Sequence, residues 1–241
     1  MFLTYGIVML RNTLRRKNFG RAQRPSPTVL NKNNHYIRCV KDTAPYKSIL
    51  IRISKIRTHI NITVIYMSKK FFKYEIIGFI FVSIIGTINH FLFELLGNSV
   101  IIGLFCPVNE SVWEHQKLLF FPFLIWSIAE YFLLERQNNF FPAKTVGITC
   151  GIIFTIAFYY SYKGISGGES MFFDILSFYV GVGISFLISY MIVKNYNKSN
   201  NHLSNISVLM LILISAVFII FTFAPPLIPL FKDPLTSTYG I

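Results

Sequence analysis

Charge is scarce in this sequence. Only 14% of the 241 residues are charged, whereas 53% are hydrophobic and 17% are aromatic. Soluble domains carry about 25% charged residues, because their surfaces face water. The shortage argues against a soluble domain and favours a protein of the lipid bilayer, which is then the partner that we expect.

Acidic residues are almost absent from the first 66 residues, which hold 13 Lys or Arg and one acid, Asp42. A secretory signal matches this leader poorly, because the apolar residues 1–10 precede the basic ones. A transit peptide, or a basic arm that contacts anionic lipid or nucleic acid, fits its composition better. We favour a third interpretation, in which residues 1–66 are disordered or not part of the native protein and translation starts at Met67.

The rest of the chain lacks the charge excess of the leader. It holds 10 Lys or Arg and 9 Asp or Glu, so residues 67–241 are not expected to bind nucleic acid. The three cysteines, Cys39, Cys106 and Cys150, do not have the spacing of a metal site. No internal repeat is evident, which argues against a carrier built from inverted repeats.

Long apolar runs are the main feature that is present. A helix needs about 20 apolar residues to cross the hydrocarbon of a bilayer, and these runs do not alternate as the strands of a barrel would. The fold class is therefore predicted as an all-α membrane protein, a bundle of about five transmembrane helices. The predicted spans lie near residues 75–97, 110–134, 145–162, 171–193 and 204–224.

Basic residues in the short connections predict the orientation of these spans. One side holds seven of them: Lys69, Lys70, Lys73, Arg136, Lys144, Lys194 and Lys198. The other side holds three: Lys117, Lys163 and Lys232. Because basic connections stay in the cytoplasm, we expect a cytoplasmic N-terminus and a C-terminus outside.

A polar stretch at residues 106–117 begins the second span. Asn109 is a suitable N-cap, so a helix is expected to start there. In that helix Glu110, Glu114 and Lys117 would share one face, with His115 on the adjacent face. Trp113 is expected to be an interfacial aromatic anchor.

The predicted topology brings further polar groups to the same outer end of the bundle. They are His90 and Glu94 in the first span and Asp174 in the fourth, with Asp233 in the C-terminal segment as a further neighbour. A charged group within hydrocarbon costs about 2.5 to 3.5 kcal/mol, which favours a functional reason for its presence.

Histidine with carboxylates is a ligand set suited to a divalent transition metal. Glu110, Glu114 and His115 are the candidate catalytic residues. The candidate metal ligands are His90, Glu94, Glu110, His115 and Asp174. A Ser111 nucleophile with His115 as its base is a weaker alternative, because both would lie on one helix.

Small residues form stripes along the third and fourth spans, at Gly151, Thr155, Gly181, Ser185 and Ser189. We expect these stripes to be helix–helix contacts, because small residues let helices approach closely. Residues 98–107 are too short to cross and are expected to dip into the interface. The proline-rich segment from Pro225 is expected to form an extended cap on the outer helix ends.

Several motifs resemble those of a family of small bacterial integral membrane proteins that is classed as a domain of unknown function. They are Pro107-Val-Asn-Glu-Ser-Val-Trp-Glu-His, the pair Asn89-His90 before it, Pro229-Leu-Phe-Lys-Asp-Pro234 and Tyr239-Gly240. The likeness covers about residues 70–241. It implies a multi-pass protein of the bacterial cytoplasmic membrane and carries over no catalytic residue.

Three functions remain open from the sequence. The first is a metal-dependent membrane hydrolase or lipid-modifying enzyme. The second is a structural or accessory membrane protein whose polar motif fixes helix packing, and the third is a proton- or cation-coupled carrier.

Overall fold

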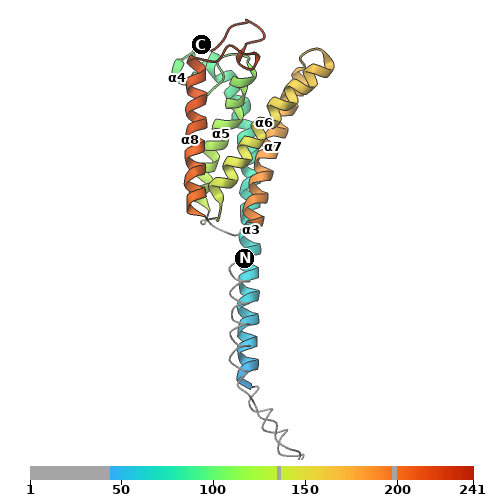
Figure 1. The fold of residues 1–241 in the computed structure, drawn as a ribbon, viewed down its shortest axis with the longest axis vertical. Helices are drawn as coiled ribbons and strands as arrows, with labels where there is room; N and C mark the ends of the chain where they lie inside the picture. The colour runs from blue at the N-terminus through green and yellow to red at the C-terminus, as the bar shows by residue number, and fades with distance from the viewer. Residues whose placement is uncertain (1–43, 135–136, 197–199) are drawn as a thin grey trace, which may run out of the picture. The chain divides into compact units, whose positions relative to one another are not determined.

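The computed structural model describes residues 44–134, 137–196 and 200–241 (Figure 1). The chain divides into two compact units, Met1–Ser68 and Lys69–Ile241. In the first unit the described residues, from Ala44 onward, belong to helix α3 (Ala44–Leu95). Most of the basic leader lies outside the described residues, and a translation start at Met67 stays a prediction.

The second unit contains five helices long and apolar enough to cross a membrane. They are the Lys69–Leu95 part of α3, α5 (Val112–Leu133), α6 (Phe140–Ser166), α7 (Met171–Asn195) and α8 (Asn201–Phe223). Strands are absent from the described residues apart from one isolated bridge between Lys232 and Tyr239. The predicted all-helical bundle of five spans is therefore confirmed, whereas its orientation stays a prediction.

The outer surface of the described bundle is apolar. Large apolar side chains of the long helices are more than half exposed, among them Ile84, Phe132 and Ile212. Such a surface is stable next to lipid and would aggregate in water. The second unit is thus built as a multi-pass membrane protein.

Aromatic residues fill the interior of the bundle. Phe120 and Phe121 of α5 pack against Phe218 of α8, while Phe123 packs against Phe186 of α7. These rings belong to one buried cluster to which α3, α5, α6, α7 and α8 all contribute. The cluster fixes the relative positions of the helices whose ends carry the polar groups.

The small-residue stripe between α6 and α7 is a packing contact, as predicted. A Cβ added to Gly151 would lie 2.7 Å from the carbonyl oxygen of Gly181, and one added to Gly181 would lie 2.4 Å from Cγ2 of Thr155. Both distances are shorter than a van der Waals contact, so α6 and α7 approach too closely here to leave room for a side chain at either glycine.

A second close approach joins α3 to α5. Pro122 lies inside α5 and has no N–H to give to the carbonyl of Leu118, four residues earlier. Gly86 of α3 lies against that carbonyl, and a Cβ on Gly86 would lie 2.6 Å from its oxygen. The glycine therefore makes room for the carbonyl that Pro122 leaves without its helical donor.

The C-terminal segment folds across the ends of α5 and α8, near the short helix α4 (Val100–Gly103) (Figure 1). It includes the 3-10 helix η1 (Pro229–Phe231). The amide of Ile241 donates to the carbonyl of Thr222 at 3.0 Å, and the Asn109 side chain donates to the carbonyl of Gly240 at 3.1 Å. This agrees with the predicted cap over helix ends.

Candidate functional site

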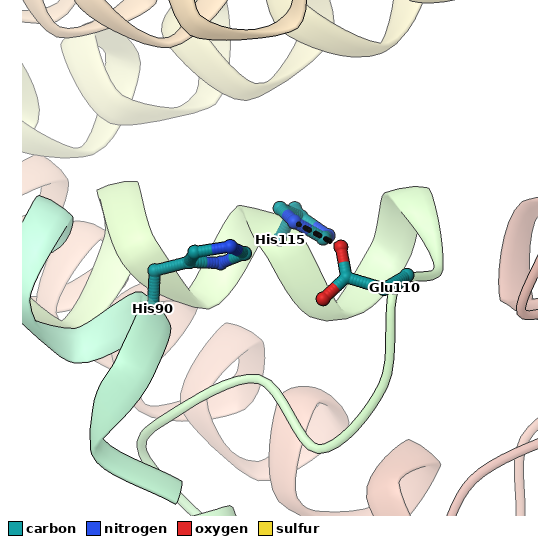
Figure 2. Close-up of side chains that lie close together, drawn as sticks. All are labelled: His90, Glu110 and His115. Atoms are coloured by element: carbon teal, nitrogen blue, oxygen red, sulfur yellow. Dashed lines mark ion pairs between the residues drawn. The ribbon is translucent and has the colours of Figure 1, made fainter. Parts of the chain in front are cut away.

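Three predicted site residues converge at one end of the bundle. His90 comes from α3, Glu110 from the loop before α5, and His115 from the first turns of α5 (Figure 2). One ligand atom from each lies within 4.8 Å of the other two. The Nε2 atom of His115 is 3.3 Å from Oε2 of Glu110, and the two imidazole rings are 5.2 Å apart between centroids.

The ring of His115 is oriented by the backbone. Its Nδ1 atom lies 2.9 Å from the carbonyl oxygen of Ser111, one turn earlier in the chain. A carbonyl only accepts hydrogen bonds, so Nδ1 carries the proton and donates it. Nε2 faces the Glu110 carboxylate: when protonated it donates a hydrogen bond to that carboxylate, and in the neutral ring it offers a lone pair, as metal-binding histidines do.

His90 completes the group from the other helix. Its side chain is half-buried, and its Nδ1 atom is buried without a hydrogen-bond partner among the described residues. A buried imidazole nitrogen usually has a partner, because leaving it unpaired costs about 1 to 3 kcal/mol. In Figure 2 the ring of His90 extends toward His115.

Glu110 is not on the helix face that the sequence predicted. Asn109 was expected as the N-cap, but the N-cap is Ser111, whose hydroxyl accepts from the amide of Glu114 at 3.3 Å. Asn109 instead accepts from the amide of Ser111 at 3.0 Å and shapes the preceding loop. Glu110 therefore lies in that loop and turns toward His115, whose hydrogen bond lowers the pKa of the Glu110 carboxyl.

Glu114 lies apart from the histidines. Its carboxylate is buried, 2.6 Å from Nζ of Lys117, and it accepts from the amide of Val108 at 3.1 Å. Lys117 is fully buried and also donates to the carbonyl of Gly103 and to the hydroxyl of Thr222. Glu114 therefore forms an ion pair with Lys117 and is not part of the group that contains the two histidines.

Glu94 and Asp174 lie outside the group of three. Glu94 is exposed, about one turn beyond His90 on α3, and its charge acts on that histidine. Asp174 accepts a hydrogen bond from the hydroxyl of Tyr162, and its charge acts on His115. Both carboxylates add negative charge around the group without joining it.

Two other predicted neighbours have local contacts of their own. Asp233 accepts from the amide of Leu235 and the hydroxyl of Thr236, so it holds a turn of the C-terminal segment. Trp113 was expected at the lipid interface, but its ring packs against Phe218, Phe221 and Phe231 beneath that segment. These contacts replace the anchoring contact expected for Trp113.

A second buried ionic group, which was not predicted from the sequence, consists of Glu75, Glu130 and Lys144. Lys144 of α6 is fully buried, 3.0 Å from Oε1 of Glu75 on α3 and 2.5 Å from Oε2 of Glu130 on α5. The prediction that Lys144 lies in a connection was wrong, because α6 begins at Phe140 and includes it. The sequence did contain a sign of this group: Glu75 and Glu130 lie inside predicted spans, and Lys144 lies directly before one.

The comparisons with known proteins identify a family and give no activity. No curated protein and no solved structure matches the chain. One family model matches residues 61–241, three quarters of the chain, including both ionic groups and the His90–Glu110–His115 group. The chain therefore belongs to that family, which is described as a family of unknown function (DUF6512).

Proposed function

We propose that this protein lies in the bacterial cytoplasmic membrane, binds a divalent transition-metal ion through His90, Glu110 and His115, and hydrolyses or otherwise modifies a lipid. The observation that carries the proposal is the convergence of one ligand atom from each residue within 4.8 Å. The unpartnered Nδ1 atom of His90 and the Nε2 atom of His115, which has a lone pair in the neutral ring, support this proposal.

Two histidines and one glutamate suit zinc in particular. In catalytic zinc sites three protein ligands leave one coordination position open for water or substrate. Zinc lowers the pKa of such a water to about 7 and so supplies a nucleophile at neutral pH. The group lies at the end of spanning helices, where we expect the ester and phosphate groups of lipids to reach it.

Metal binding is the first test. The full chain, purified in detergent, is expected to bind one zinc ion, and His90→Gln, Glu110→Gln and His115→Gln are each expected to weaken binding by about tenfold or more. Glu169→Gln is the matched control, because it removes an exposed carboxylate of the α6–α7 loop that is not among the three proposed ligands. A folded protein that binds neither zinc, manganese nor nickel would refute the proposal.

Lipid chemistry is the second test. The zinc-loaded chain is reconstituted in vesicles of phosphatidylethanolamine and phosphatidylglycerol, and the lipids are compared by mass spectrometry with those of a His115→Gln preparation. A product formed only by the wild-type chain supports an enzyme. Metal binding without any product would support the metal site but would contradict hydrolysis or modification of these lipids.

A structural role is the second candidate, and the contacts of Lys117 favour it. This buried side chain connects Glu114, Gly103 and Thr222, so it ties α5 to α8 and to the segment between α3 and α5. If the polar motif serves packing alone, Glu114→Gln reduces accumulation of the protein while the three metal-ligand variants behave as wild type. A carrier would instead show gradient-driven ion flux in vesicles.

A further inference from the structure

The buried group of Glu75, Lys144 and Glu130 contains one more carboxylate than ammonium groups. All three residues are at most 3% exposed, and each comes from a different helix, α3, α6 or α5. Along α3, Glu75 lies 15 residues from His90, which is about 22 Å of helix. The group is therefore a site separate from the proposed metal site.

The contacts of the group account for one negative charge and leave the other unbalanced. Oε1 of Glu75 accepts from Nζ of Lys144 at 3.0 Å and from the hydroxyl of Ser189 at 2.8 Å. Glu130 lies 2.5 Å from the same ammonium. In the described part of the chain, these are the charged and polar groups that face Glu75 from α5, α6 and α7.

Two carboxylate oxygens of the group are left without partners. Oε2 of Glu75 and both oxygens of Glu130 are buried and accept no hydrogen bond from the described residues, and of these three only Oε2 of Glu130 has an ion-pair contact, with Lys144. The surroundings do not balance the second negative charge, because aromatic rings carry no positive charge. The ammonium of Lys144 lies 5.2 to 5.5 Å from the ring centroids of four of them: Phe71, Phe123, Phe140 and Phe186. An uncompensated negative charge in such an apolar site is costly.

We propose that Glu75 and Glu130 share one exchangeable proton, so that with the Lys144 ammonium the site is neutral. The proton comes from water and converts one carboxylate into a carboxylic acid, and its release to water restores the carboxylate. The two acids titrate as a pair, as carboxylates close together do. The ligand of this site is therefore a proton. The site suits a reaction or transport step in which each chain takes up or releases one proton.

Infrared spectroscopy of the full chain in lipid vesicles at pH 7 tests this proposal. The wild type is expected to show the C=O stretch of a protonated carboxyl, shifted after transfer to deuterated water. Glu75→Gln and Glu130→Gln each leave one carboxylate and one ammonium, so both are expected to lose that band. Glu169→Gln, which changes an exposed carboxylate, is the control that keeps it.

Each other result would overturn the proposal. A wild-type spectrum without a protonated carboxyl, or a band that both glutamine variants keep, would place no proton on this pair. A band that never shifts in deuterated water would show a proton that does not exchange, and a band abolished by sodium chloride would make sodium the ligand. If the glutamine variants do not fold, Lys144→Met provides the test. Without the ammonium both carboxyls should be protonated, so the band should grow, and an unchanged band would overturn the proposal.

Discussion

The ammonium of Lys117 donates a hydrogen bond to the hydroxyl of Thr222 at 2.6 Å, joining α5 to α8 in the interior of the bundle. The same ammonium lies 2.6 Å from Glu114 and 2.8 Å from the carbonyl of Gly103. Both ionised side chains are at most 3% exposed, so neither can exchange its partner for water. This end of the bundle therefore depends on one lysine that is completely paired.

Lys117→Met is expected to destabilise the protein strongly. The substitution keeps the length of the side chain but leaves the Glu114 carboxylate buried without its cation, which costs about 3 to 5 kcal/mol. The double variant Glu114→Gln/Lys117→Met removes both charges and is expected to recover part of the loss. The measurement is the free energy of unfolding in mixed detergent. Equal stability of Lys117→Met and wild type would show that the ion pair contributes nothing.

Thr222→Val is expected to cost less, because it removes only one of the acceptors of Lys117. The loss of a hydrogen bond to a charged group corresponds to about 1.5 to 3 kcal/mol. Ser215→Ala on the same helix is the control, since its hydroxyl donates only to the Leu211 carbonyl of its own helix. We expect a lower unfolding temperature for Thr222→Val than for Ser215→Ala, and the reverse order would contradict the assignment.

Glycine-to-alanine substitutions are expected to separate close contacts from open positions. Gly86→Ala and Gly151→Ala place a Cβ 2.6 and 2.7 Å from a backbone oxygen of the neighbouring helix, so each should cost about 1 to 3 kcal/mol. Gly164 lies in α6 with open space around it, so Gly164→Ala should be neutral or stabilising by up to about 1 kcal/mol. Thermal unfolding of the three purified variants provides the comparison.

Acid is expected to loosen the connection between α6 and α7. Hydrogen bonds from Lys163 and Tyr159 lower the pKa of Glu169 from its ordinary 4.5. The ionised form therefore adds stability above pH 4.5 that is lost as the pH falls through the lower folded-state pKa. The pair is partly exposed, so the effect is under about 1 kcal/mol and weakens with salt. Glu169→Gln should abolish this part of the pH dependence of unfolding.

Cysteine labelling tests the proposed orientation. Gly168 lies in the α6–α7 loop and Asn201 begins α8, and both are exposed at opposite ends of spanning helices. In a chain whose three native cysteines are replaced, Gly168→Cys in intact cells is expected to react with a membrane-impermeant maleimide. Asn201→Cys should react only after permeabilisation. The opposite pattern would reverse the orientation and place the His90 end of the bundle in the cytoplasm.

The sequence was sufficient to predict the spans and much of the histidine group. Apolar runs set the number of helices, and span ends placed His90 and His115 at one end of the bundle. The loop position of Glu110 was missed because Asn109 and Ser111 are both good N-caps, and only tertiary contacts decide between them. Asn109 is held by Gly240, which is 131 residues away in the sequence.

The Glu75–Lys144–Glu130 group could not be derived from hydropathy. Glu75 and Glu130 fell inside predicted spans without being singled out, whereas Lys144 was assigned to a connection and counted among the orienting basic residues. Its burial depends on contacts from α3, α5 and α7, which no local pattern encodes. A fully buried lysine changes the orientation argument only slightly, because other basic residues remain on the same side.

The chain has only two tryptophans, and their positions make them separate optical reporters. Trp113 contacts Phe218 and Phe231 beneath the C-terminal segment, whereas Trp126 packs against Phe81 within the core. Replacing either one by phenylalanine leaves a single tryptophan, which can be excited selectively over the tyrosines. Fluorescence of the two resulting proteins can therefore follow whether the C-terminal segment detaches before the helices separate.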